Sequence, residues 1–411
     1  MTRIRRGGRN GLIIAATAVL AASFGGCRDD ITAPTQGRIA LAIVGAADVD
    51  VYVDGEFVGT DPDTLEALPE GTYLLSAVRD CYETLPAREV TIAVRAGEIA
   101  NAQFTMEARE FGDVQVRAFD ELSGQEIVGA EILREAQSGN LVPTGLATPA
   151  TVPDLPCGVR LQVRRSPEYA DSDSRVIDID TGGTVLADFT LGPPSAALAE
   201  MFTYVICPNC PQAAAELAAI EAAYPHEVYL IEWHTWSSLP LYTVEGEQRE
   251  EYYLGSVQPG WPLVVFQGDG ANWLVGSQTG TLAQYWDRVN AIRQACSNDC
   301  PVILGTESAI GGGRADVTAR AKVRSGAVPG GVTLRWVLVE DDVIAPGNQP
   351  DFDAVPRAVH EQAAALAPSG QVAEWSHGVD LDPSWVEANL RWVVFLQSDA
   401  DQAVLAVHGS H

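Results

Sequence analysis

The chain has 411 residues, of which 46% are hydrophobic and 20% are charged, and its formal net charge is −29. This length has room for three or four domains, and the apolar fraction is enough to build real cores, which excludes wholesale disorder. A surface this acidic repels nucleic acid, so we exclude nucleic acid as a partner.

Residues 1–26 have the parts of a bacterial export signal. Four arginines, with no acidic residue among them, precede an apolar run from Gly11 to Phe24. That run is too short to cross a bilayer as a helix, but it fits the core of a signal peptide. We therefore expect export from the cytoplasm.

Small residues then lead into a cysteine, in the order Gly25-Gly26-Cys27. This resembles the bacterial lipobox, in which cleavage exposes the Cys and its sulfur carries diacylglycerol. The alternative is an ordinary signal peptide with an incidental Cys. We expect a lipid anchor on Cys27 that binds the protein to a membrane, followed by a tether at 27–37. Arg28 is not the familiar inner-membrane retention residue, which favours the outer membrane over the inner one.

Six further cysteines remain, and an even number outside the cytoplasm favours disulfides. They are Cys81, Cys157, Cys207, Cys210, Cys296 and Cys300. Two pairs are close in sequence, 207 with 210 and 296 with 300, so elimination makes Cys81 and Cys157 partners. The alternative is that the two close pairs together supply four ligands to a zinc ion, but an oxidising compartment favours separate disulfides. We expect no metal site and no cofactor.

Residues 38–107 alternate between apolar and polar with a period of two, which predicts strands. Asp54-Gly55 lies between two such runs and predicts a hairpin, because a tight primed turn needs positive φ. Val58-Gly59, Asp61-Pro62 and Leu68-Pro69-Glu70-Gly71 follow in order. This order resembles the PEGA domain, a small surface β-sandwich.

Residues 111–191 repeat the plan more loosely. Thr148-Pro149 takes the place of the Asp-Pro turn, and Leu155-Pro156-Cys157-Gly158 takes the place of Leu-Pro-Glu-Gly. The Asp-Gly hairpin is missing, so this second module is PEGA-like or resembles the carboxypeptidase-regulatory sandwiches. Such modules are spacers, or surfaces that bind carbohydrate or protein.

Residues 198–300 follow the order strand, CxxC, helix, strand, which is that of thioredoxin. An apolar run at 201–206 leads into Cys207-Pro208-Asn209-Cys210, and an apolar period of helical spacing comes next. The positive end of a helix stabilises a thiolate, so Cys207 would be the exposed nucleophile and Cys210 the resolving residue. Pro262, just before an apolar strand, matches the thioredoxin cis-proline, and His234 is a candidate proton shuttle.

Motifs across 200–411 resemble one family in particular, the outer membrane protein Omp-twenty-eight family of thioredoxin-like bacterial lipoproteins. The matching residues are Phe202-Thr203, Cys207-x-Asn209-Cys210-Pro211, His234-Thr235, Tyr252-Tyr253, Gly260-x-Pro262, Trp392 to Gln397 and Ala403 to Ala406. The resemblance implies an envelope protein with a thioredoxin-like domain and a β domain after it. It does not bring an activity with it.

Three departures from thioredoxin argue against an efficient oxidoreductase. Ile206 stands where thioredoxins have Trp, and the bulky Trp261 precedes the cis-proline, where it covers the disulfide or clamps a peptide. Met201 stands where thioredoxins keep a buried carboxylate. Glu200 is one position away and would point to the other face of the strand.

Residues 301–411 return to a β pattern. Alternating apolar residues at 315–323 and 332–338 predict strands, Gly311-Gly312-Gly313 predicts a turn, and 389–397 with 402–408 predict a closing hairpin. Asp353 to Leu366 is expected to be a short helix or a loop. Hydrolase and phosphate-binding motifs are absent from the sequence.

The expected fold is therefore multidomain and mostly β, with one α/β domain. It comprises two small β-sandwich modules, a thioredoxin-like domain and a C-terminal β-sandwich. Two functions stay open. In the first, the chain is a thiol-disulfide oxidoreductase acting on envelope proteins or peptides through Cys207, Cys210 and Trp261-Pro262. In the second, it is a non-enzymatic binding or structural lipoprotein whose CxxC is a fixed disulfide.

Overall fold

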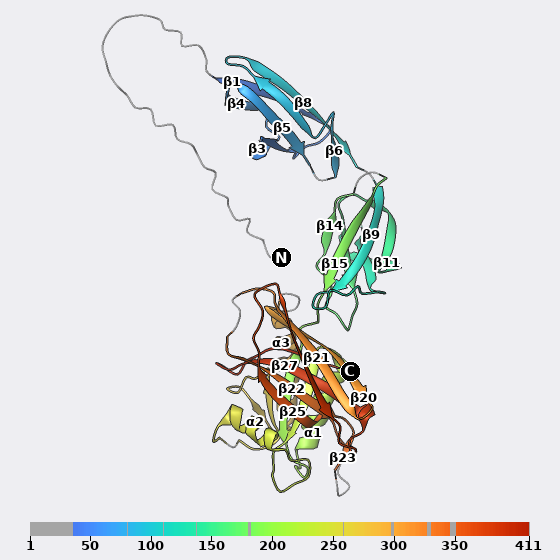
Figure 1. Cartoon of the computed structure of the whole chain (residues 1–411), viewed down its shortest axis with the longest axis vertical. Helices are drawn as coiled ribbons and strands as arrows, with labels where there is room; N and C mark the ends of the chain where they lie inside the picture. The colour runs from blue at the N-terminus through green and yellow to red at the C-terminus, as the bar shows by residue number, and fades with distance from the viewer. Residues whose placement is uncertain are drawn as a thin grey trace, which may run out of the picture. The chain divides into compact units, whose positions relative to one another are not determined.

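The computed structural model describes residues 36–410 except 80, 110, 137, 180–181, 258, 297–299, 327–329 and 346–350. The predicted signal peptide and the lipidation site at Cys27 lie outside the described residues. The chain divides into two compact units, Met1–Glu107 and Ala108–His411. Among the described residues, Figure 1 shows strands in both units and helices in the second. Within the described residues, helices that are long and apolar enough to cross a membrane are absent.

The first unit is a small sandwich of two four-stranded sheets, in the orders β4-β1-β8-β6 and β3-β2-β5-β7. Its strands are β1 (Gln36–Val44), β2 (Asp50–Val53), β3 (Glu56–Thr60), β4 (Thr64–Pro69), β5 (Gly71–Val78), β6 (Tyr82–Leu85), β7 (Glu89–Val94) and β8 (Ile99–Ala108). Ile39, Leu75 and Phe104 are fully buried between the sheets. The hairpin predicted at Asp54-Gly55 joins β2 to β3, and both residues have the positive φ (50° and 83°) that a primed turn needs.

The next part of the chain repeats this topology. Its strands are β9 (Phe111–Asp120), β10 (Glu131–Glu135), β11 (Leu141–Ala147), β12 (Ala150–Pro156), β13 (Val159–Arg164), β14 (Arg175–Ile177) and β15 (Thr184–Leu191). The sheet orders are β12-β9-β15 and β11-β10-β13-β14. In both modules the first strand pairs in parallel with the last one, β1 with β8 and β9 with β15. The repeat that the sequence predicts is therefore a repeat of fold.

An α/β part follows, built on a four-stranded sheet in the order β17-β16-β18-β19. Its elements are β16 (Ala197–Thr203), α1 (Cys210–Ala223), β17 (Val228–His234), α2 (Val244–Leu254), β18 (Leu263–Phe266), β19 (Leu274–Val275) and α3 (Thr279–Cys296). Strand β16 pairs in parallel with β17 and antiparallel with β18. The strand predicted at 201–206 is thus correct in kind and wrong in bounds, since it begins at Ala197 and ends at Thr203.

The C-terminal part is a sandwich of the sheets β20-β21-β26 and β25-β22-β27-β28, with a small β23–β24 ribbon beside them. Its elements are β20 (Val302–Gly311), β21 (Arg314–Val323), β22 (Val332–Glu340), β23 (Val343–Ile344), β24 (Asp351–Phe352), β25 (Val355–Ala363), β26 (Val372–Asp380), η1 (Glu387–Asn389), β27 (Leu390–Ser398) and β28 (Val404–Gly409). The closing hairpin is confirmed, since β27 pairs antiparallel with β28. The short helix or loop expected at Asp353 to Leu366 is wrong, because β25 occupies most of it and pairs with β22.

The α/β and C-terminal parts share one hydrophobic core. On β22, Trp336 packs toward the sandwich interior, while its neighbour Val337 packs with residues of the α/β sheet such as Phe202. The β25-β22-β27-β28 sheet is therefore a middle layer that is buried on both faces. The outer edge of β17 is also covered, because Glu232 N donates a hydrogen bond to Ala354 O (2.9 Å).

Candidate functional site

Cys207 and Cys210 form a disulfide just before helix α1. The helix begins at Cys210, with Asn209 as its N-cap and a proline in its first turn. Cys207 lies in the turn that precedes the helix, where its backbone N donates to Tyr204 O (2.9 Å). The expected placement is therefore corrected by one turn: Cys210, and not Cys207, occupies the helix N-terminus.

Both sulfur-bearing residues are buried, with exposed fractions of 5% for Cys207 and 3% for Cys210. The expectation that the turn exposes Cys207 is wrong, and the C-terminal part supplies the reason. The disulfide lines a cavity of about 220 Å³ whose other wall includes the β24 residues Asp351 and Phe352. Phe352 also packs in a small apolar cluster with Val205, immediately before the CxxC. A contact far along the chain therefore covers the sulfurs.

The Trp261–Pro262 peptide bond is cis, as its position before a strand predicted. Because Leu263 pairs with Phe202, this proline lies at the sheet edge where β16 ends and the CxxC segment begins. The ring of Trp261 does not lie alone. Its centroid is 5.3 Å from that of Tyr204 and 5.7 Å from that of Trp236, so three aromatic rings cluster at this edge.

Strands β16 and β17 carry one acidic residue each, Glu200 and Glu232, and the two side chains lie in different environments. Glu200 is fully buried and accepts hydrogen bonds from Arg249 Nε (2.7 Å) and Trp233 Nε1 (3.1 Å). Arg249 also donates to Gln397 of β27 (2.7 Å). Burial alone would raise the pKa of the Glu200 carboxyl, but Arg249 and the hydrogen bonds outweigh it and hold that pKa below its usual range. As predicted, Glu200 faces away from α1, and it joins the α/β part to the C-terminal sandwich.

Glu232 is the acid that sequence reasoning missed. It lies on β17 directly beside Met201 of β16, the position at which a carboxylate was sought and not found. Glu232 is 1% exposed and lines the same cavity as Cys207 and Cys210. Burial, and secondarily the charge of Asp353, raises the pKa of the Glu232 carboxyl to about 8. Among the described residues its Oε2 has no hydrogen-bond partner.

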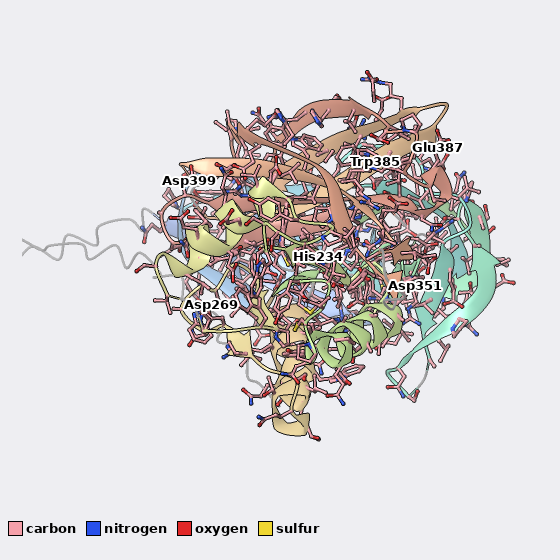
Figure 2. The ribbon with its side chains drawn as sticks, turned by 90° about the horizontal axis from the view of Figure 1, so that it is seen from below. His234, Asp269, Asp351, Trp385, Glu387 and Asp399 are labelled. Carbon is pink, nitrogen blue, oxygen red and sulfur yellow. A yellow bond between two sulfur atoms is a disulfide. The ribbon has the colours of Figure 1, made fainter. Side chains whose placement is uncertain are left out.

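His234 lies two residues further along the same face of β17. Its Nε2 is 3.5 Å from Oε1 of Glu232, and its ring packs edge-on against that of Phe352, with centroids 5.0 Å apart. Burial, aided by the charge of Arg357, lowers the pKa of His234 to about 4. Both members of the pair are therefore neutral at pH 7, so their contact is not an ion pair. Figure 2 places His234 and Asp351 on the ribbon; His234 is buried, whereas Asp351 is exposed.

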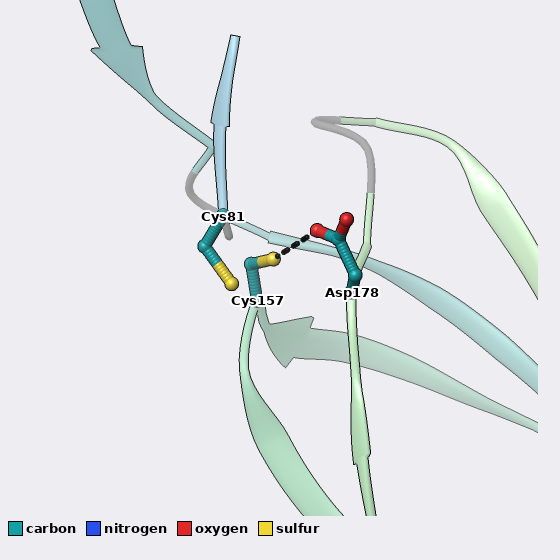
Figure 3. A group of neighbouring side chains, drawn as sticks. All are labelled: Cys81, Cys157 and Asp178. Carbon is teal, nitrogen blue, oxygen red and sulfur yellow. Dashed lines mark hydrogen bonds between the residues drawn. The ribbon is translucent and has the colours of Figure 1, made fainter. Parts of the chain in front are cut away.

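The other cysteines are partly described. Cys81, Cys157 and Cys300 are each in a disulfide. Sγ of Cys157 lies 3.1 Å from Oδ1 of Asp178, the contact drawn as a dashed line in Figure 3. The side chain of Cys296 lies outside the described residues, so the predicted pairings, Cys81 with Cys157 and Cys296 with Cys300, stay predictions.

Comparisons with known proteins give low similarity. The sequence matches no family model and no curated protein. Among solved structures, HBP35 of Porphyromonas gingivalis matches with a TM-score of 0.44 at 12% identity, over 53% of this chain and 75% of that one. A protein of Agrobacterium tumefaciens matches with a TM-score of 0.37 at 18% identity, over 53% and 93%. A domain of the outer membrane lipoprotein Omp28 from Porphyromonas gingivalis matches with a TM-score of 0.21 at 17% identity, over 27% and 86%. These values are too low to assign a family or an activity.

Proposed function

We propose that this chain is an exported, lipid-anchored protein of the bacterial envelope whose α/β part is a thioredoxin-like domain. Its Cys207–Cys210 disulfide exchanges with thiols of envelope proteins or peptides. The observation that carries the proposal is the arrangement around this disulfide. Strand β16 leads into the disulfide, and helix α1 begins at its second cysteine. The cis Trp261–Pro262 bond comes directly before strand β18, which pairs with β16.

The reaction requires a partner thiolate to reach Cys207. The cavity beside the disulfide supplies a volume of about 220 Å³ for that approach. Ile206 and Trp236, next to the site, are 60% and 44% exposed. Their apolar surface would hold a peptide segment near the disulfide, with Trp261-Pro262 orienting its backbone.

Trapping tests this function on the full-length lipoprotein. In Cys210→Ser, the Cys207 thiolate attacks a disulfide of an envelope protein and releases one of its two sulfurs as a thiolate. Residue 210 then lacks the sulfur that would resolve the product, so the mixed disulfide should accumulate. Cys207→Ser is the matched control, because it removes the attacking sulfur and leaves the rest of the site. Equal trapping by the two variants, or none by either, would contradict thiol-disulfide exchange.

The second candidate function is a non-enzymatic binding or structural lipoprotein in which the same disulfide is fixed. The observation that favours it is burial, since Cys207 and Cys210 are 5% and 3% exposed. The two functions differ in reducibility. A fixed disulfide resists glutathione and dithiothreitol in the folded protein, whereas an exchanging one equilibrates with them.

Location is proposed on the sequence alone. The lipid on Cys27 holds the protein on the outer membrane, and along the chain the two β modules come between the lipid and the disulfide domain. Membrane fractionation of the wild type and Cys27→Ser tests this. Recovery of wild-type protein in the soluble fraction, or in the inner membrane, would contradict it.

A further inference from the structure

The face of the α/β sheet beneath helix α1 carries an acid in an unexpected place. Side chains of β16 and β17 alternate between the two faces of the sheet, and the parallel register sets Met201 beside Glu232. On the opposite face, Glu200 is held by Arg249. The only acids on these two strands, Glu200 and Glu232, are thus divided between the faces, and Glu232 is the one on the side of the disulfide.

Glu232 is a buried carboxyl group whose hydrogen-bonding capacity is not fully used. A buried carboxyl group that serves only structure is normally satisfied by hydrogen bonds. Within the described residues, Oε2 of Glu232 has no such bond, and Oε1 has His234 Nε2 at 3.5 Å. Glu232 lines the same cavity as Cys207 and Cys210, and the volume of that cavity, about 220 Å³, has room for water.

We propose that Glu232 gives a proton to Cys210 when the Cys207–Cys210 disulfide is opened, and takes it back when the disulfide re-forms. The inference rests on the proposed thiol-disulfide exchange and adds the residue that donates and accepts the proton. Proton transfer through one intervening water is within the reach of a general acid or base.

In the direction of reduction, a partner thiolate attacks Cys207 Sγ and forms a new S–S bond, and the Cys207–Cys210 bond breaks. The electron pair of that bond goes to Cys210 Sγ, which takes the proton of the Glu232 carboxyl group. The products are the mixed disulfide on Cys207, the Cys210 thiol and the Glu232 carboxylate. A second thiol of the partner loses its proton to solvent, and the resulting thiolate attacks the partner's own sulfur in the mixed disulfide. The partner leaves as an oxidised disulfide, and the electron pair of the broken bond leaves Cys207 as thiolate.

The charged groups around Glu232 suit this role. Burial, and after it the negative charge of Asp353, disfavours the carboxylate form of Glu232 and keeps the carboxyl group protonated. Asp351 lines the same cavity from β24 and is exposed. His234 is neutral, with Arg357 beyond it, so it does not hold Glu232 as a carboxylate. On the α1 side, the cavity is lined by the cysteines, Pro211 and alanines, which are uncharged.

Reduction kinetics test the proposal. The full-length protein is reduced with dithiothreitol from pH 6 to 10, and alkylation with mass spectrometry follows the Cys207/Cys210 peptide. After division by the dithiothreitol thiolate concentration, the wild-type rate should fall with an inflection near pH 8, where Glu232 loses its proton. Glu232→Gln should lose that inflection and react at least about tenfold more slowly at pH 7. Glu232→Asp keeps an acid and should keep an inflection.

Asp351→Asn is the matched control, because it removes an exposed carboxylate from the same cavity and should retain the inflection. A Glu232→Gln protein with the wild-type rate and profile would overturn the role of Glu232 and leave the exchange function intact. A wild-type disulfide that dithiothreitol does not open in the folded protein would overturn the exchange function itself.

A second measurement does not depend on any variant folding. Carbon NMR of the Glu232 carboxyl group in the oxidised and the reduced wild-type protein should give titrations at least about one pH unit apart, because the proton acceptor at Cys210 appears only on reduction. Identical titrations in the two states would overturn the proposal.

Discussion

Burial of Glu232 predicts an unusual dependence of stability on pH. Its pKa is raised to about 8 in the folded protein, from a usual value of 4.5. Between these two values the folded protein keeps the proton and the unfolded chain loses it. The folded state therefore binds more protons, and the free energy of unfolding falls as pH rises. Glu232→Gln removes this effect.

The neighbouring His234 acts in the opposite direction, over a different range. Its pKa is lowered from 6.5 to about 4, so between these values the unfolded chain binds more protons and stability rises with pH. Of these two groups, Glu232 makes the larger contribution above pH 6.5. One pH unit in that regime is worth about 1.4 kcal/mol, so the window from pH 6.5 to 8 should cost the wild type about 2 kcal/mol that Glu232→Gln does not lose.

Urea unfolding of both proteins at pH 6.5 and 8 measures this difference. Tryptophan fluorescence is the probe, since all nine Trp residues lie in the α/β and C-terminal parts. Comparing the two proteins cancels the groups that they share. If the wild type and Glu232→Gln lose the same free energy of unfolding across the window, within about 0.5 kcal/mol, then Glu232 is not a protonated buried acid and the reasoning fails.

Three further predictions concern the interface, the anchor and the remaining disulfides. Arg249→Met leaves Glu200 buried without its cation and should destabilise the protein by about 3–5 kcal/mol in urea unfolding; a loss below about 1 kcal/mol would contradict a desolvated pair. Cys27→Ser should abolish metabolic labelling with fatty acid and shift the protein to the aqueous phase of a detergent partition, whereas retained labelling would place the lipid elsewhere. Peptide mapping without reduction should recover Cys81 joined to Cys157, and either one joined to a different cysteine would refute the pairing by elimination.

Local patterns in the sequence predicted the parts of the fold that depend on local physics. Alternation at 315–323 and 332–338 predicted β21 and β22, because each strand buries one or both faces. The Asp54-Gly55 turn followed from the backbone conformations that those residues adopt easily. The CxxC and the cis Trp261–Pro262 bond were likewise predictable from short motifs.

Other elements depend on contacts that local patterns do not carry. Helix α2 (Val244–Leu254) is rich in acidic residues, and its charged sequence resembles a solvated loop. Thr243 caps it by accepting a hydrogen bond from Gly246 N (3.1 Å), and Arg249 fastens it to Glu200. In strand β25 (Val355–Ala363), buried and exposed residues do not alternate, and only the first two residues are buried. Its pairing with β22 sets its conformation.

In the candidate site too, some features follow from local sequence and others only from contacts. The sequence shows that Met201 stands where thioredoxins have an acid. The acid beside that position, Glu232, comes from the neighbouring strand, 31 positions later in the chain. Only the register of β16 with β17 brings Glu232 there. The burial of Cys207 has an even more distant cause, because Phe352 of the C-terminal part packs against Val205.

The reduction potential of Cys207–Cys210 tests the central claim most directly. It is measured on the folded, full-length protein by equilibration with glutathione and dithiothreitol buffers, with alkylation and mass spectrometry of the CxxC peptide as the readout. An exchanging pair should equilibrate between about −120 and −270 mV, the range of known dithiol oxidoreductases. A potential below about −300 mV, or a disulfide that does not equilibrate until the protein unfolds, is the behaviour of a structural disulfide and would contradict the proposed function.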